Sequence, residues 1–336
     1  MILIYVSCYD SGELLAYRLD PASGTLVPAQ VLQPGGKLMP MAFSPDRRRL
    51  YVARRNEPLQ ALTFAIDPHS GELSPIGEGP LPHSMANLAT DATGRFLFSA
   101  SFGGDQVAVS PIGEDGVVGE ALQVLPTRAN AHCVAADPGN RFVLATCMGG
   151  GVVMQYRFDA ATGRLWPNAV PMMEPHAGAS PRHLVFGPQA RFVYLLNELD
   201  AAVDVLAFDA ASGTLSTVQT IASLPAGATE KPWASDLHLH PDGRFLYSSE
   251  RRSNLLSIFE VDAGTGRLTL RGHMPTETQP RGFAITPDGA FMVVAGETSH
   301  HLSVYRIDAA TGALELTSRH ATGQSPSWIN TLQLPG

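Results

Sequence analysis

This chain of 336 residues is poor in charge and cysteine and has no long apolar run, and each scarcity excludes a class of protein. Only 16% of the residues are charged, and the net charge is −8, which argues against nucleic-acid binding because that function needs a broad basic surface. Three cysteines do not make a disulfide framework. No apolar run approaches the roughly 18 residues of a membrane-spanning helix. We therefore expect neither a nucleic-acid nor a membrane partner.

The first six residues also bear on localisation. They lack the basic segment with which a signal peptide begins, and their run of β-favouring residues predicts a strand. Free thiols are typical of a reducing compartment. We expect a cytoplasmic protein.

Backbone breakers, in contrast, are abundant. The chain has 32 Gly and 26 Pro, scattered along its length, which excludes a mostly helical protein and predicts many short elements joined by turns. Hydrophobic residues make up 44%, enough for a large core. At roughly 150 residues per domain the length would suggest two domains, although large all-β folds exceed that size.

A repeated phrase of the sequence decides whether the chain forms one large domain or two. It runs Asp, two residues, a small residue, Gly, one residue, Leu, as in Asp20 to Leu26 and Asp67 to Leu73. The glycines of its seven copies, one of them decayed, stand at positions 24, 71, 116, 163, 213, 266 and 312. The spacing stays even when the interval from the last glycine to the first is counted through the two ends of the chain. This regularity predicts seven similar units.

A second phrase, Pro-Asp-Gly-Arg-Phe-Leu-Tyr at 241–247, has relatives in five of the other six units. Each unit is therefore predicted as four strands with tight turns at both phrases, and four strands per ~45 residues is typical of a β-propeller blade. We predict an all-β, seven-bladed β-propeller of four-stranded antiparallel blades, forming a single domain over residues 1–336. The chain should start on a second strand and end on a first strand, so that both termini build the closing blade.

In such a ring the two turn phrases occupy one face, and the variable segments meet on the other face around the channel mouth. Starts of first strands place there His132, Arg182, His183, Asp236 and Arg281. Ends of second strands add Arg55, Asn197, Glu198, Arg251, His300 and His301.

This set of residues predicts a locally basic site for a small anion, because arginine forms forked contacts with carboxylate or phosphate. Glu198 among arginines should be ionised and able to take a proton from water, with His132 donating or relaying one. Alternatively, Arg182 and Glu198 form only an ion pair between blades. A metal at Asp236, His238 and His240 is less favoured, because no known metal-ligand spacing is present and histidines there can equally fill the core.

Several segments carry a family resemblance over the whole chain. Ser180-Pro-Arg182-His183, Asn197-Glu198, Trp233-Ala-Ser-Asp236, Thr276-Glu-Thr-Gln-Pro-Arg281-Gly-Phe283, Ser299-His300-His301 and Gly323-Gln-Ser-Pro-Ser-Trp328 resemble segments of the propeller-type bacterial 6-phosphogluconolactonases. The resemblance implies hydrolysis of a sugar-acid lactone in the oxidative pentose phosphate pathway, without a cofactor. Fungal carboxy-muconate lactonizing enzymes belong to the same wider family.

The resemblance also implies roles. The proposed His, two Arg and Glu of the muconate enzymes fall on His132, Arg182, Arg251 and Glu198, and Arg281 matches the bacterial lactonases. We expect Glu198, His132 and Arg182 to be catalytic, with Arg182 and Arg281 on the carbonyl side and Arg251, with Arg55, on a distal anion. His183, Asp236, Asn197, His300 and His301 should also bind substrate.

Two alternatives differ in function. The substrate could be an unphosphorylated aldonolactone or a muconate-type lactone handled by isomerisation. A non-catalytic scaffold would instead present an apolar or aromatic patch on the ring face, whereas the sequence favours an Arg-Glu-His cluster. The expected partner is a small anionic sugar lactone, and the expected assembly is a monomer or weak homodimer.

Overall fold

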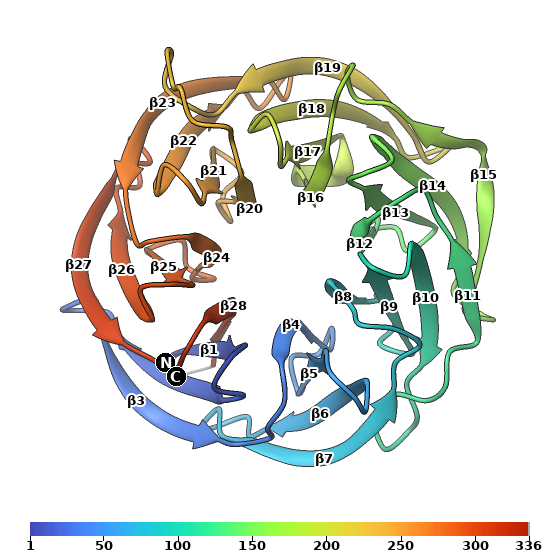
Figure 1. The fold of residues 1–336 in the computed structure, drawn as a ribbon, viewed down its shortest axis with the longest axis horizontal. Coiled ribbons are helices and arrows are strands. Elements are labelled where there is room, and N and C mark those ends of the chain that lie inside the picture. Colours follow the sequence, from blue (N-terminus) through green and yellow to red (C-terminus); the bar gives the residue numbers. More distant parts are fainter. Residues whose placement is uncertain (335–336) are drawn as a thin grey trace.

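The computed structural model describes residues 1–334, and within them 28 strands form seven four-stranded antiparallel sheets around a central channel (Figure 1). The predicted seven-bladed β-propeller is thereby confirmed. A single 3₁₀ turn, η1 (Pro188–Ala190), is the one helical element among the described residues. No helix in this part of the chain is long and apolar enough to cross a membrane.

The two inner strands of each blade are short and almost wholly buried. The strands that line the channel are β4 (Leu38–Phe43), β8 (Asn87–Thr90), β12 (Ala131–Ala136), β16 (Pro181–Phe186), β20 (Ala234–Leu239), β24 (Pro280–Ile285) and β28 (Pro326–Gln333). The second strands are β5 (Arg49–Arg54), β9 (Phe96–Ser101), β13 (Phe142–Cys147), β17 (Phe192–Asn197), β21 (Phe245–Glu250), β25 (Phe291–Gly296) and β1 (Ile2–Cys8).

The two outer strands complete each blade, and the fourth carries most of the exposed residues. The third strands are β6 (Gln60–Ile66), β10 (Gln106–Pro111), β14 (Val152–Asp159), β18 (Ala202–Asp209), β22 (Leu255–Val261), β26 (His301–Ile307) and β2 (Leu14–Asp20). The outermost are β7 (Leu73–Pro80), β11 (Gln123–Pro126), β15 (Arg164–Met173), β19 (Thr214–Ala222), β23 (Leu268–Pro275), β27 (Leu314–Ala321) and β3 (Thr25–Leu32).

The closing blade is shared by the two ends of the chain, as predicted. Strand β28 pairs with β1 from Ile2 opposite Gln333 to Ser7 opposite Trp328, and the sheet order is β28-β1-β2-β3. Figure 1 shows β28 and β1, from opposite ends of the chain, side by side in this blade. Backbone hydrogen bonds between β28 and β1 thus join the two ends of the chain in one sheet and close the ring.

The two repeated phrases turn out to be halves of one contact between neighbouring blades. Phe142 of the second phrase packs under Gly213 of the first phrase, in the turn of the next blade, and Arg141 stacks over Phe142 while donating to the Ala210 carbonyl of that turn. The same contact recurs with the pairs Phe96 and Gly163, Phe192 and Gly266, and Phe245 and Gly312. This packing explains why both phrases recur with one spacing.

We expect Gly213→Ala to lower the free energy of unfolding by about 2 to 4 kcal/mol, because it combines backbone strain with a clash. Gly213 has a φ of +69°, and a Cβ there would lie 2.1 Å from the Phe142 ring. Gly178→Ala is the matched control, since φ is +80° with no atom within 4 Å, and should cost about 1 to 2 kcal/mol. Denaturant unfolding measures both, and equal costs would contradict the proposed contact.

The core lies between blades. One cluster joins Ile4 and Val6 of β1 to Val293 and Val304 of the preceding blade, and six similar clusters complete the ring. This packing holds the starts of the channel-lining strands in place.

At those starts, six of the seven channel-lining strands have an irregular register. The irregular segments contain Met39, His132, Arg182, Asp236, Arg281 and Ser327. Because a β-bulge re-aims a side chain, these residues turn toward the channel mouth.

Candidate active site

All seven blades contribute to one small cavity at the channel mouth. It is lined by Met39, Ala86, His132, Arg182, His183, Asp236, Arg281, Gly282, Ser327 and Trp328. These residues are spread over almost 300 positions of sequence, and the free volume open to a water molecule between them is about 10 Å³, room for about one water. The structure therefore brings together five of the predicted site residues: His132, Arg182, His183, Asp236 and Arg281.

Two histidines in this cavity have unpartnered ring nitrogens. The rings of His132 and His183 are 5.1 Å apart, and both residues are buried. His132 Nδ1 and His183 Nε2 are shielded from solvent and find no hydrogen-bond partner among the described residues. Burial, followed by the nearby Arg182 guanidinium, lowers the pKa of each imidazole, that of His132 strongly. Both rings are therefore neutral near pH 7 and can accept a proton.

Asp236 orients the second of these histidines. His183 Nδ1 lies 2.7 Å from Asp236 Oδ1, and because a carboxylate only accepts, Nδ1 carries the proton. The lone pair is then on Nε2, the unpartnered atom. The pKa of Asp236 is well below its usual range despite burial, because His238, His183 and their hydrogen bonds favour the carboxylate. This carboxylate–imidazole pair has the arrangement of a general base.

Glu198 lies beside this cavity, between two guanidinium groups. Its Oε2 is 2.7 Å from Arg182 Nε and 3.0 Å from Arg251 Nη2, and its Oε1 accepts a hydrogen bond from the Trp233 indole at 3.1 Å. Arg182 also donates to the Ser235 carbonyl in the next blade. The predicted ion pair of Arg182 and Glu198 is therefore present, but it lies within one blade, because β16 and β17 belong to the same sheet. The ion pair of Glu198 that crosses to the next blade is the one with Arg251.

Arg251 is buried, although its predicted role is to bind a distal anion of the substrate. It is 3% exposed, stacks 3.8 Å from the Trp233 ring, and donates to the carbonyls of Trp233 and Ala234. Burial and the positive charge of Arg182 lower its pKa. Two buried guanidinium groups share one carboxylate, so the cluster has an excess of positive charge, in agreement with the predicted basic character.

Arg55 and Arg281 approach each other across the closing blade. Arg55 Nη1 and Arg281 Nη2 lie 3.4 and 3.1 Å from the same atom, the sulfur of Met39. Arg281 also pairs with Glu297 at 3.0 Å. Both guanidinium groups are half-buried at the rim of the cavity.

The structure does not bring Asn197, His300 or His301 into this cluster. Asn197 is buried, and its amide bonds to the Ser180 amide, the Ala202 carbonyl and Asp204. His300 accepts from the Ser325 amide in a turn, and His301 begins the third strand of its blade, with Nδ1 on the Ser299 carbonyl. Their role in substrate binding stays a prediction.

The possible metal ligands also separate. His238 Nε2 contacts Asp236, whereas His240 turns to the Gly289 carbonyl and Asp242. In residues 1–334 no group of three His, Cys, Asp or Glu side chains is arranged to hold a metal ion.

Sequence reasoning missed several residues of the site, among them Met39, Trp233, Glu297 and Ser84. Met39 occupies the position in its blade that His132, Arg182 and Arg281 occupy in theirs, so an alignment of the repeats would have found it. Trp233 stands in the sequence analysis only as part of a motif of the family resemblance. No sequence pattern indicates Glu297 or Ser84, because their contacts depend on packing between distant strands.

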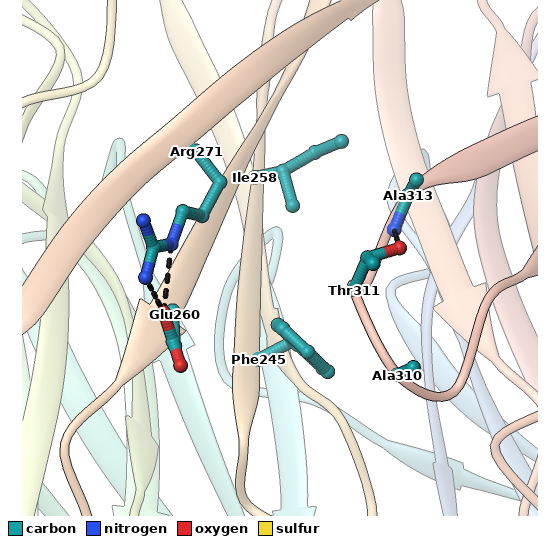
Figure 2. Close-up of a pocket in the computed structure, with 7 residues that line it drawn as sticks. All are labelled: Phe245, Ile258, Glu260, Arg271, Ala310, Thr311 and Ala313. Carbon is teal, nitrogen blue, oxygen red and sulfur yellow. Dashed lines mark hydrogen bonds and ion pairs between the residues drawn. The ribbon is translucent and has the colours of Figure 1, made fainter.

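A wider hollow lies between two blades, away from the channel, and Figure 2 shows the residues that line it. Its charged groups, Arg271 and Glu260, pair with each other and are about half exposed. The remaining lining residues are apolar or small, apart from Thr311. The two charged groups are paired with each other and are not free for acid–base chemistry. We therefore interpret this hollow as a structural groove between two blades and not as an active site.

Fold and site together define a propeller enzyme with acid–base groups at its channel mouth. A family model described as "Lactonase, 7-bladed beta-propeller" matches residues 3–331. The chain belongs to this family of seven-bladed β-propeller lactonases, and the resemblance seen in the sequence is confirmed.

Curated relatives cover nearly the whole chain. A 6-phosphogluconolactonase of Pectobacterium carotovorum is 45% identical over 332 residues, and that of Pectobacterium atrosepticum is 42% identical, each alignment covering 99% of both chains. Among solved structures, a periplasmic gluconolactonase of Pseudomonas aeruginosa is 30% identical, with a TM-score of 0.93 and complete coverage of both chains.

Proposed function

We propose that this protein hydrolyses 6-phosphogluconolactone, a sugar-acid δ-lactone, to 6-phosphogluconate. The curated relatives of that name support the substrate. The observation that carries the reaction is the pair of neutral, buried imidazoles with unpartnered nitrogens at a cavity the size of one water. Water held there would have a proton acceptor beside it and arginines around it.

In the proposed mechanism, the lactone lies over the channel mouth with its carbonyl oxygen toward Arg182. A water oxygen attacks the carbonyl carbon while His183 Nε2 takes one water proton, and Asp236 stabilises the resulting imidazolium. The Arg182 guanidinium stabilises the negative charge that develops on the carbonyl oxygen. The ring C–O bond then breaks, and the His183 imidazolium returns its proton to the leaving oxygen, directly or by relay through His132. Positioning supplies much of the rate, because aldonolactones already hydrolyse slowly in water.

Glu198 has two possible parts in this scheme. We predicted from the sequence that it activates water, and this stays a prediction. Its contacts favour a positioning role, since Oε2 already accepts a hydrogen bond from Arg182 and forms an ion pair with Arg251, while Oε1 accepts a hydrogen bond from Trp233. In that role Glu198 would hold the Arg182 guanidinium at the angle that faces the carbonyl oxygen.

A lactonase assay tests the proposal directly. The purified protein should accelerate hydrolysis of freshly made 6-phosphogluconolactone well above the uncatalysed rate, followed by proton release at constant pH. Unphosphorylated glucono-δ-lactone is the companion substrate. Hydrolysis of neither compound above background would contradict the proposed function.

Preference for the unphosphorylated lactone is the second candidate. The observation that favours it is the 30% identical relative, which is named a gluconolactonase without phosphate. The same pair of assays separates the two candidates, because a higher kcat/KM for glucono-δ-lactone would reverse the proposed preference.

We also propose a cytoplasmic enzyme of the oxidative pentose phosphate pathway, acting as a monomer or weak homodimer without nucleic-acid partners. A phosphorylated sugar lactone arises inside the cell, which supports this compartment for the proposed substrate. The periplasmic relative makes the compartment worth measuring by cell fractionation.

A further inference from the structure

Arg55 and Arg281 make an unusual approach at the rim of the cavity. They come from blades on either side of the closing blade, yet their guanidinium groups meet at the sulfur of Met39, at 3.4 and 3.1 Å. Like charges this close repel one another, and a thioether neutralises neither. The arrangement is therefore one that a bound anion would stabilise.

The charges around this pair do not balance. Arg281 has one carboxylate partner, Glu297, at 3.0 Å. Arg55 has none within ion-pair distance in residues 1–334, and its only other side-chain partner there is the Ser84 hydroxyl, 3.0 Å from Nε. Burial, and then the charge of Arg281, lowers the pKa of Arg55. The nearby ammonium of Lys37 is already paired with Asp10 at 2.7 Å.

The other arginines of the site are less available. Arg251, which we expected at a distal anion, is buried among the carbonyls of Trp233 and Ala234 and the Glu198 carboxylate. Arg182 is 2% exposed and engaged with Glu198 and the Ser235 carbonyl. Arg55 and Arg281 are thus the two guanidinium groups of the site that are both accessible and incompletely paired.

We infer that Arg55 and Arg281, with the Ser84 hydroxyl, bind a phosphoryl group at the far end of the lactone from the carbonyl. Guanidinium groups suit this ligand because they donate paired hydrogen bonds to its oxygens. Arg281 lines the cavity that holds His132 and His183, and Arg55 contacts Met39 of the same lining, so a phosphate there leaves the ring over the imidazoles. This inference rests on the proposed function and assigns the preference for a phosphorylated lactone to Arg55 and Arg281.

The test compares two arginines that are neighbours in the sequence. Arg55→Gln should lower the ratio of kcat/KM for 6-phosphogluconolactone to that for glucono-δ-lactone by about 10- to 100-fold, mainly through KM. Arg54→Gln is the matched control, because the Arg54 side chain turns to other partners, the Pro58 carbonyl and the Glu78 carboxylate at 2.7 Å. Its ratio should stay within about twofold of the unsubstituted protein.

A ratio for Arg55→Gln equal to that of the unsubstituted protein would overturn the inference. Calorimetry with inorganic phosphate keeps the test independent of catalysis. If neither lactone is hydrolysed, the proposed function fails, but phosphate binding that Arg55→Gln weakens and Arg54→Gln does not would still support the anion site. Absence of phosphate binding, or equal binding by both variants, would overturn it.

Discussion

Replacing His183 by asparagine is expected to lower kcat for lactone hydrolysis by about 100- to 10,000-fold, the usual contribution of a general base. Asparagine can still donate to Asp236, but it has no nitrogen lone pair to take a proton from water. The measurement is the hydrolysis rate of the purified variant with saturating lactone. Thermal unfolding of the same sample checks that the fold is retained.

His69→Asn is the control for this change. His69 is exposed in a turn of the opposite face, where its backbone amide donates to Asp67, so its replacement should leave the rate unchanged. A rate for His183→Asn within about threefold of the unsubstituted protein would exclude His183 as the base, since general-base loss costs far more.

The pH profile provides a second measurement of the same role. The pKa of His183 is lowered from 6.5 by burial and Arg182, against the opposing effect of Asp236, and that of His132 is lowered further. A base acts in its neutral form, so kcat/KM should be level above pH 6.5 and fall only below it. A fall that begins above pH 6.5 would contradict the geometry. His183→Asn should lose the acid limb that belongs to this residue.

Replacing Glu198 by glutamine is expected to lower the free energy of unfolding by about 3 to 5 kcal/mol, because two buried guanidinium groups lose their shared carboxylate. Arg182 and Arg251 are 2% and 3% exposed, so water cannot compensate for the lost charge. Denaturant unfolding at neutral pH measures the loss. The control is Glu260→Gln in the exposed pair with Arg271, which should cost about 1 kcal/mol or less.

The same variant distinguishes the two roles of Glu198. If Glu198 takes the proton from water, Glu198→Gln should lower kcat by at least about 100-fold under conditions where the variant is folded. If Glu198 positions Arg182, the loss should be smaller and the acid limb assigned to His183 should persist. Turnover equal to that of the unsubstituted protein would remove Glu198 from the mechanism altogether.

Much of the ring was predictable because its information is local. The turn that holds Gly213 needs a residue with positive φ, and the strand after Pro-Asp-Gly is buried along its whole length and needs mostly apolar residues, so each blade repeats the same short phrases. What local patterns could not show is that Phe142 packs under Gly213 of the next blade. That contact joins residues about 70 positions apart and depends on how two blades meet.

The sequence by itself determined the number of blades, the shared closing blade and the face on which the variable residues gather. These three features follow from turn-forming residues that repeat every ~48 residues and from the order of strands and turns within each repeat. Only the tertiary structure decided the partners within the site. It paired His183 with Asp236, enclosed Arg251, joined Arg55 to Arg281 through Met39, and kept His300 and His301 apart from the cavity. The physical reason is that burial and distances of a few ångströms set each of these interactions, and both arise from packing between strands that are remote in sequence.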